Sequence, residues 1–196
     1  MGVPVLVLAS GSAGRLRVLR DAGFDPEVVV SWVDESNDEN LAAAELVAVL
    51  AERKATAVAA IRPEALVVGC DSMLDLDGTA IGKPVSAADA AGTWRRMAGR
   101  SGTLCTGHCL IHAGRVATGV AATTIRFGTP TEAELSAYVA TGEALSLAGS
   151  FSIDGRSAPF VDGIDGDPSA VIGLSLPLLR RLLAELGIGI TDLWRS

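Results

Sequence analysis

Two short segments, Leu8–Arg15 and Val68–Ser72, each pass from apolar residues into small polar residues and one charged side chain. Apolar runs of this kind are typical of buried strands in α/β proteins, whose carboxyl ends carry ligand sites. In the first segment, N–H groups at a helix start can hold an anion, and Arg15 adds a cation. The second delivers Asp71, which can take a proton from water or hold a divalent ion that activates water. Together they indicate an enzyme that acts on a phosphorylated small molecule.

Both segments also have an ordinary structural interpretation. Ser12 can cap a helix that ends near Gly23, and Arg15 would then be a solvated residue of the first turn. A cation in that turn opposes the helix dipole, and a phosphate opposite Arg15 would remove the conflict. Asp71 could simply cap a turn, although a carboxylate after a buried strand is costly unless it is paired or bound to a metal. The residues alone leave these alternatives open.

Three cations and one acidic residue are further candidates. Lys83 lies between a glycine and a proline in a short rigid loop, which gives a phosphate-binding lysine a defined position. Lys54, on a predicted helix, is expected to be a solvated residue, and Arg100, in a glycine-flanked turn, fits either role. Glu35 belongs to an acidic cluster of the kind that is usually a solvated loop, but a carboxylate opposite Asp71 would complete a metal site.

Cys105, His108, Cys109 and His112 are spaced so that, on a helix, they would share one face and suggest zinc. The threonine, glycine and isoleucine residues around them favour a strand instead. In a strand the two cysteines face one side and the two histidines the other. We therefore expect no metal site here.

Apolar periodicity and turn residues predict an α/β fold. Helices alternate with strands in the first half and a long hairpin follows, so a mixed sheet is favoured over a purely parallel one. Residues 142–166 are expected to be mostly loop with short strands. The predicted strands are 3–9, 27–31, 66–76, 79–81, 103–112 and 116–127, and the predicted helices are 12–23, 41–61, 86–97, 131–140 and 176–186.

The composition excludes several classes of partner. A chain of 196 residues, 49% hydrophobic and 20% charged, is globular and fits one domain or one domain with two lobes. A net charge of −7 and only 4% aromatic residues disfavour nucleic acid and an anionic membrane. No apolar stretch reaches the roughly 18 residues of a membrane span. The first residues lack a basic signal-peptide region, and three cysteines form no disulfide framework, so we expect a cytoplasmic protein.

Taken together, short motifs along nearly the whole chain resemble those of the Maf family of nucleoside triphosphate pyrophosphatases. Leu8-Ala9-Ser10-Gly11-Ser12…Arg15 is similar to the family's opening motif Leu-Ala-Ser-x-Ser-Pro-Arg-Arg. Val33-Asp34-Glu35 is similar to its acidic motif, and Cys70-Asp71-Ser72 matches the position of its catalytic aspartate. Seven or more small motifs in fixed order are far more specific than any one of them. The others are Arg53-Lys54-Ala55, Gly82-Lys83-Pro84, Gly99-Arg100-Ser101, Thr106-Gly107, Tyr138…Gly142-Glu143, Ala148-Gly149-Ser150-Phe151 and Val171-Ile172-Gly173-Leu174.

The resemblance implies cleavage of a nucleoside triphosphate between the α- and β-phosphates, giving the monophosphate and pyrophosphate with a divalent cation, Mg²⁺ or Mn²⁺. It implies one domain over residues 1–196 with a two-lobed α/β fold related to the inosine triphosphatase-like enzymes, a cleft between the lobes, and a tendency to form homodimers. Asp71 would accept the proton of the attacking water and, with Glu35, bind the metal. The substrate-binding residues implied are Ser10, Ser12, Arg15, Lys54, Ser72, Lys83, Arg100 and Asp154.

The chain departs from the family pattern at two positions that bear on base preference. Gly14 replaces an arginine and Asp154 replaces a glutamine, and in the pyrimidine-selective branch both help to set specificity. Preference for dTTP or UTP, or for 7-methyl-GTP and related modified nucleotides, is therefore open. The lost cation also motivates a second hypothesis, a nucleotide-binding regulator of cell division or septum formation with weak catalysis. Retention of Asp71 and Glu35 favours the enzyme, because a binder needs no carboxylate beside a triphosphate.

Overall fold

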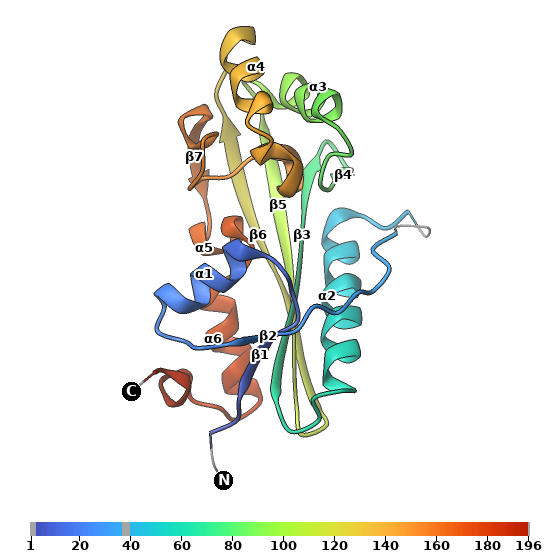
Figure 1. The fold of residues 1–196 in the computed structure, drawn as a ribbon, viewed down its shortest axis with the longest axis vertical. Coiled ribbons are helices and arrows are strands. Elements are labelled where there is room, and N and C mark those ends of the chain that lie inside the picture. Colours follow the sequence, from blue (N-terminus) through green and yellow to red (C-terminus); the bar gives the residue numbers. More distant parts are fainter. Residues whose placement is uncertain (1–2, 37–39, 196) are drawn as a thin grey trace.

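A computed structural model describes residues 3–36 and 40–195 and has a mixed α/β fold (Figure 1). Over these residues a seven-stranded sheet has the order β2-β1-β3-β5-β6-β7, and the short β4 pairs with β3. β1 is parallel to β2 and β3, and the other pairs are antiparallel, which confirms the predicted mixed sheet. The strands are β1 (Leu6–Leu8), β2 (Glu27–Val28), β3 (Leu66–Leu76), β4 (Thr79–Ile81), β5 (Ser101–His112), β6 (Arg115–Phe127) and β7 (Val161–Asp165).

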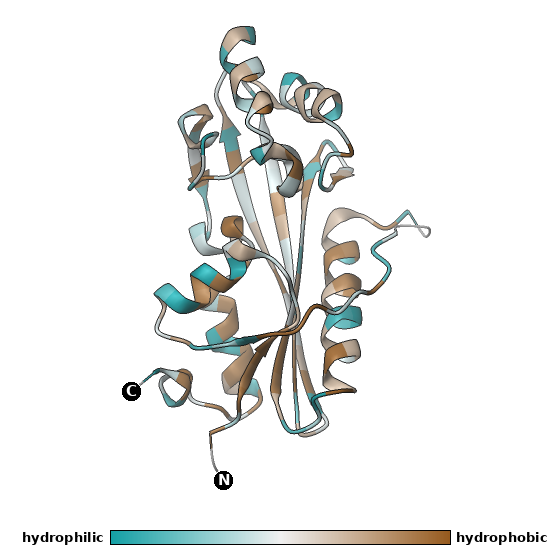
Figure 2. Cartoon of the chain, viewed as in Figure 1, coloured by the Kyte–Doolittle hydropathy of each residue, from teal (hydrophilic) through white to brown (hydrophobic). Residues whose placement is uncertain are grey.

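Helices cover both faces of one end of this sheet. α2 packs on β3 and β5, and α6 packs on β5 and β6. Alternation along β3 directs Val67 toward α2, and directs Leu66 and Val68 toward the side of α6. Between these helices the strands are brown in the hydropathy view, as burial on both faces requires (Figure 2). The α-helices are α1 (Ala13–Asp21), α2 (Ala43–Ala59), α3 (Ala87–Met97), α4 (Glu132–Ala140), α5 (Pro168–Ile172) and α6 (Leu176–Glu185).

A second hydrophobic cluster lies at the other end of the long strands, under α3 and α4 (Figure 1). Its centre is the fully buried Trp94, which meets the rings of Phe127, Tyr138 and Phe160 edge to face with centroids 5.8–6.1 Å apart. Edge-to-face pairs at this spacing are favourable beyond the area that they bury. Each end of the sheet thus has its own core, and β3, β5 and β6 run through both.

One edge of β3 is left without a neighbouring strand between the two ends. β1 pairs with Leu66–Val68 and β4 pairs with Leu74–Leu76, while β5 follows the other edge from Val67 to Asp75. Over the described residues, no strand therefore covers this edge between residues 69 and 73. Asp71 lies in the middle of that gap. The predicted strand over residues 66–76 is confirmed, so the carboxylate belongs to the interior of a continuous strand of 11 residues and the alternative that Asp71 caps a turn after the strand is wrong.

The predicted hairpin turn at Asp77-Gly78, the long hairpin of β5 and β6, and all five predicted helices are confirmed within a few residues. The opposite orientation of cysteines and histidines in β5 is also confirmed. Cys109 packs on the side of α2, whereas His108 accepts a hydrogen bond from the Ser175 N–H on the side of α6. Three predictions needed correction: the strand at 3–9 shortens to Leu6–Leu8, the strand at 27–31 shortens to two residues, and α5 was not foreseen.

Part of the predicted acidic loop, residues 37–39, lies outside the described residues. In the remainder of the chain, no helix has both the length and the apolar character that crossing a membrane requires. All three cysteines are free and buried.

Candidate active site

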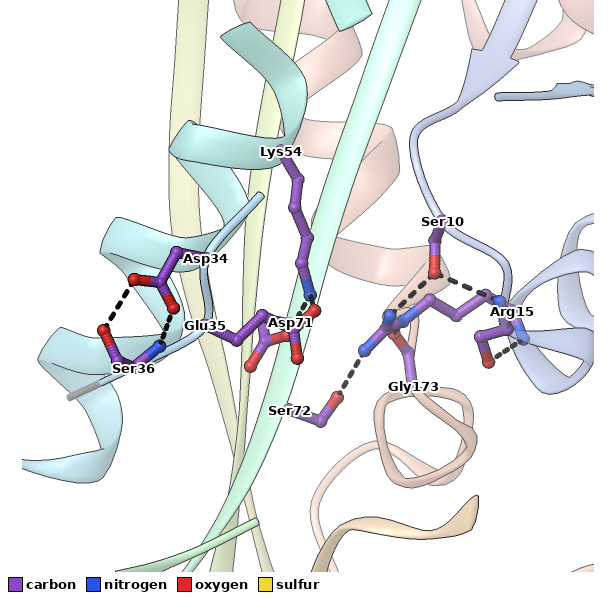
Figure 3. A network of polar contacts seen from close by, with 10 residues as sticks. Ser10, Arg15, Asp34, Glu35, Ser36, Lys54, Asp71, Ser72 and Gly173 are labelled. Atoms are coloured by element: carbon purple, nitrogen blue, oxygen red, sulfur yellow. Dashed lines mark hydrogen bonds and ion pairs between the residues drawn. The ribbon is translucent and has the colours of Figure 1, made fainter. Parts of the chain in front are cut away.

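Lys54 is the buried centre of an ion-pair group with Asp71 and Glu35 (Figure 3). Its ammonium contacts Glu35 Oε1 at 2.7 Å and forms a shorter ion pair with Asp71 Oδ1. Lys54 is 6% exposed and Asp71 is 5% exposed. The expectation that Lys54 is a solvated helix residue is therefore wrong, and the physical reason is its pairing. A lysine and an aspartate are rarely this buried unless each offsets the charge of the other.

Two glycines bring α2 close enough to the sheet for this pairing. A Cβ on Gly69 of β3 would lie 2.7 Å from the backbone nitrogen of Ala55, and nearer still to the carbonyl oxygen of Ala51. A Cβ on Gly107 of β5 would lie 2.9 Å from the nitrogen of Ala48. Real side chains do not tolerate such distances to backbone. Because Asp71 follows Gly69 by two residues, both face α2, and the close approach places the Lys54 side chain on the carboxylate.

Glu35 reaches the group from the loop between β2 and α2. The loop is shaped by Asp34, whose carboxylate accepts hydrogen bonds from the Ser36 N–H (2.9 Å) and hydroxyl (3.0 Å). Burial opposes ionisation of Glu35. The hydrogen bond and charge of Lys54, with the charges of Lys83 and Arg15, outweigh that effect and lower its pKa. Glu35 is consequently a carboxylate at neutral pH.

Arg15 forms a second polar group on the opposite face of β3. Its Nε–H donates to the Gly173 carbonyl (2.8 Å), Nη1 donates to the Ser10 hydroxyl (2.9 Å) and Nη2 donates to the Ser72 hydroxyl (3.2 Å). A guanidinium carries five N–H donors, so these bonds leave two for a ligand. Arg15 is 9% exposed, which corrects the alternative of a solvated arginine in an ordinary helix.

Ser72 connects the hydrogen bonds of Arg15 to those of Thr106 on the neighbouring strand β5. Its hydroxyl lies 3.0 Å from the Thr106 hydroxyl, which donates to the Ala170 carbonyl at 2.9 Å. His108 Nδ1 is 3.1 Å from the Thr106 carbonyl. Burial lowers the pKa of His108 to about 4, so the ring is neutral and its Nε2 accepts a hydrogen bond from the Ser175 N–H. Ser72 was among the predicted residues, but the supporting roles of Thr106 and His108 were not predicted, although Thr106 stands in one of the short motifs.

Three of the remaining predicted residues, Ser12, Lys83 and Asp154, lie in three different places. Ser12 caps α1, its hydroxyl accepting the Arg15 N–H at 3.4 Å, which confirms the predicted helix start. Lys83 is exposed in the loop between β4 and α3, near enough to Glu35 for its charge to lower that pKa. Asp154 pairs with Arg17 of α1 and accepts a hydrogen bond from Ser152.

Arg100 lies apart from this group. It pairs with Asp77 in the turn after β3, six residues beyond Asp71. At about 3.3 Å per residue of strand, that is roughly 20 Å away. Its side chain is half exposed and belongs to the far end of the sheet.

Two carboxylates facing one ammonium suit a hard divalent cation. No group of three or more His, Cys, Asp or Glu side chains that could hold a metal occurs within residues 3–36 and 40–195. Mg²⁺ is commonly bound by one or two carboxylates together with substrate phosphates rather than by an all-protein cage. Glu35 and Asp71 therefore fit a cation that arrives with a phosphorylated ligand. On this mixed α/β fold, the carboxylates of Glu35 and Asp71 and the ammonium of Lys54 provide the charges that a phosphorylated ligand with a divalent cation needs.

Comparison with known proteins gives the family. A family model described as "Maf-like protein" matches residues 5–186. A nucleoside triphosphate pyrophosphatase of Streptomyces coelicolor is 60% identical over 194 residues, covering 96% of this chain and 94% of the relative. Proteins of the same name from Streptomyces avermitilis and Salinispora tropica are 58% and 54% identical, over 96% of this chain and 94% and 87% of their own lengths. The chain belongs to the Maf family.

Proposed function

We propose that this protein is a nucleoside triphosphate pyrophosphatase, which hydrolyses a nucleoside triphosphate to the monophosphate and pyrophosphate with a divalent cation. The observation that carries the proposal is the buried ion pair of Lys54 and Asp71, joined by the half-exposed Glu35, beside the uncovered edge of β3. The names of the curated relatives support the same reaction. A structural core has little use for two carboxylates and a lysine at such a position, because each carries a desolvation cost.

In this reaction Asp71 accepts a proton from the attacking water. The water oxygen bonds to phosphorus at the α–β anhydride, the bond from phosphorus to the leaving phosphate oxygen breaks, and pyrophosphate leaves with the electron pair. The ammonium of Lys54 holds Asp71 in place and offsets negative charge that builds up on the phosphates. A divalent cation bound by Glu35 and Asp71 would neutralise phosphate charge and lower the pKa of a bound water.

The phosphate chain is held by groups from both faces of β3. Lys83 is a free cation in the sense that it forms none of the ion pairs among the described residues, so its charge is available to a phosphate. Arg15 contributes its two remaining N–H groups. The other substrate-binding residues of this proposal are Ser10, Ser12 and Ser72 around Arg15, and Asp154 for the base; Arg100 is dropped because it lies at the far end of β3.

The test is release of pyrophosphate with Mg²⁺ or Mn²⁺ across canonical, 7-methylated and deaminated triphosphates. Asp71→Asn removes the proton acceptor but keeps the side-chain shape, and Lys54 keeps its ion pair with Glu35, so turnover should vanish while the protein stays folded with a lower melting temperature. Asp75→Asn is the matched control, because it makes the same change four residues along the same face of β3 and should keep activity. Activity retained in Asp71→Asn contradicts the proposed role.

The same panel separates the enzyme from a nucleotide-binding regulator. Turnover on one group of triphosphates names the substrate, whether a pyrimidine or a modified purine. Binding without turnover on any of them would favour the regulator. A cytoplasmic location, one domain over residues 1–196, a homodimer and the absence of nucleic-acid partners stay predictions.

A further inference from the structure

A strained turn lies where the aromatic end of the fold meets β3. It is the short 3-10 segment Ala148–Ser150, in which Gly149 and Ser150 both have left-handed backbone, with φ of 67° and 61°. Left-handed backbone is unfavourable for serine and persists where the surroundings hold it in place. Ser150 is fully buried, and its carbonyl oxygen accepts two hydrogen bonds, from Trp94 Nε1 at 2.8 Å and from the Tyr138 hydroxyl at 3.0 Å.

This 3-10 segment is hydrogen-bonded to the loop that carries Lys83. The Gly149 N–H donates to the carbonyl oxygen of Gly82 at 2.9 Å, and Gly82 immediately precedes Lys83. Gly149 also rests on β3, where an added Cβ would come within 2.9 Å of Leu74 Cδ2. The position of this loop relative to β3 therefore depends on the left-handed backbone of Gly149 and Ser150. That backbone is held by the hydrogen bonds from Trp94 and Tyr138.

The Lys83 side chain does little to fix its own position. Its side chain is exposed and, over the described residues, it takes part in none of the ion pairs, yet its charge reaches Glu35. A lysine side chain has several rotatable bonds, so the place where its ammonium can act depends on where its backbone is held. The hydrogen bond from Gly149 to Gly82 supplies that hold.

We propose that Tyr138 and Trp94 are positioning residues for the phosphate-binding lysine, Lys83, acting through the carbonyl of Ser150. This inference rests on the proposed function, in which Lys83 holds the phosphates. Both aromatic side chains are buried, with 0% of Trp94 and 3% of Tyr138 exposed, so the role proposed for them is an indirect one. Burial raises the pKa of Tyr138, so its hydroxyl keeps the proton that it donates to Ser150.

The competing explanation is that Tyr138 only helps to pack the aromatic core, whose loss would lower stability without a specific effect on Lys83. Phe160 provides the matched control. Its ring packs on those of Trp94 and Tyr138, with centroids 5.8 Å and 6.2 Å away, but it has no side-chain hydrogen bond to Ser150. Phe160→Leu therefore loosens the same core without touching the link to Lys83.

The experiment is a double-mutant cycle between Tyr138→Phe and Lys83→Ala, with Phe160→Leu analysed in the same two backgrounds. Removing one hydrogen bond is worth up to about tenfold, so Tyr138→Phe should lower kcat/KM roughly five- to tenfold, mainly by raising KM. In the Lys83→Ala background the further loss should be less than about twofold, because the group that Tyr138 positions is gone. Phe160→Leu should lower the melting temperature and act alike in both backgrounds.

Binding of inorganic tripolyphosphate, measured by calorimetry, gives a second readout that needs no turnover. The wild-type protein should bind it about five- to tenfold more tightly than Tyr138→Phe, and the difference should disappear with Lys83→Ala. Equal losses from Tyr138→Phe in both backgrounds, or no loss at all, overturn the positioning role. A wild-type protein that hydrolyses no triphosphate but shows this pattern with tripolyphosphate refutes the proposed reaction and keeps the positioning role. Absence of tripolyphosphate binding by the wild type overturns the inference.

Discussion

Replacing Gly69 by alanine adds one methyl group where β3 and α2 come closest. The new Cβ would lie 2.7 Å from the Ala55 nitrogen, whereas ordinary contact begins at 3.4 Å. The atoms in the way belong to the helix backbone and cannot rotate aside. α2 must therefore move off the sheet by at least roughly 0.7 Å, the difference between these two distances, and by more to clear the nearer Ala51 carbonyl oxygen, because a packed interior has no free space to absorb a methyl group.

The size of the effect follows from two opposing contributions. Overpacking of this kind costs about 1–3 kcal/mol, and alanine recovers roughly 0.5–1 kcal/mol over glycine in a strand because it has less backbone freedom to lose. The difference is a net loss of up to about 2.5 kcal/mol, or up to roughly 10 °C of melting temperature for a chain of this length. Activity should suffer more. Lys54 moves with α2 while Asp71 stays on β3, and a misplacement near 1 Å can cost on the order of a hundredfold.

Calorimetric melting and pyrophosphate release measure the two effects on one preparation. The control is Gly92→Ala on α3, where the added Cβ meets nothing within 4 Å and alanine should stabilise the helix by up to about 1 kcal/mol. We expect Gly69→Ala to lose ten- to a hundredfold in kcat and Gly92→Ala to lose none. If Gly69→Ala retains both its melting temperature and its kcat, α2 does not rest on β3 at this point and the account of how Lys54 is placed is wrong.

Three further outcomes are expected. Lys54→Met leaves the buried Asp71 without a cation, so urea denaturation should show a loss of about 3 kcal/mol. For His108, a folded-state pKa of about 4 lies below the usual 6.5; between these pH values the unfolded chain binds more protons, so stability falls as pH falls, by about 3 kcal/mol in all. Urea denaturation from pH 7 to pH 4 should show this slope, and His108→Gln should flatten it. Arg17→Ala breaks a half-exposed pair with Asp154, so calorimetry should show a loss below about 1 kcal/mol, and a larger loss would mean that the pair is a structural link.

The local elements could be predicted because their signals are local. Asp77-Gly78 specifies a tight turn between two apolar strands, and both residues take the left-handed backbone that such turns need. Ser12 and Ser86 accept N–H groups at the first turns of α1 and α3, as their side chains suggest. In contrast, α5 is only five residues long, too short for an apolar period to show in the sequence.

The site was predictable as a set of residue types but not as an arrangement. A lysine beside Arg53 in a charged stretch of helix gives no sign of being buried, because nothing local shows which helix face meets the sheet. That information lies in Gly69 and Gly107, which become neighbours when β3 pairs with β5 and only then define where α2 can approach. The strand that contains Asp71 was predicted, but the uncovered edge beside it was not, since the end of β1 and the start of β4 are set by register.

The gap at the edge of β3 explains how two groups on opposite faces can act together. Asp71 and Ser72 are neighbours in sequence, and strand alternation sends one toward Lys54 and the other toward Arg15. Between β1 and β4 no backbone of a neighbouring described strand separates the faces, so side chains of both reach round the same edge. The pKa of Glu35 reflects the charges of both groups, because it is lowered by Lys54 from one face and by Arg15 from the other. An extended polyphosphate lying along that edge would meet both groups without any movement of the sheet.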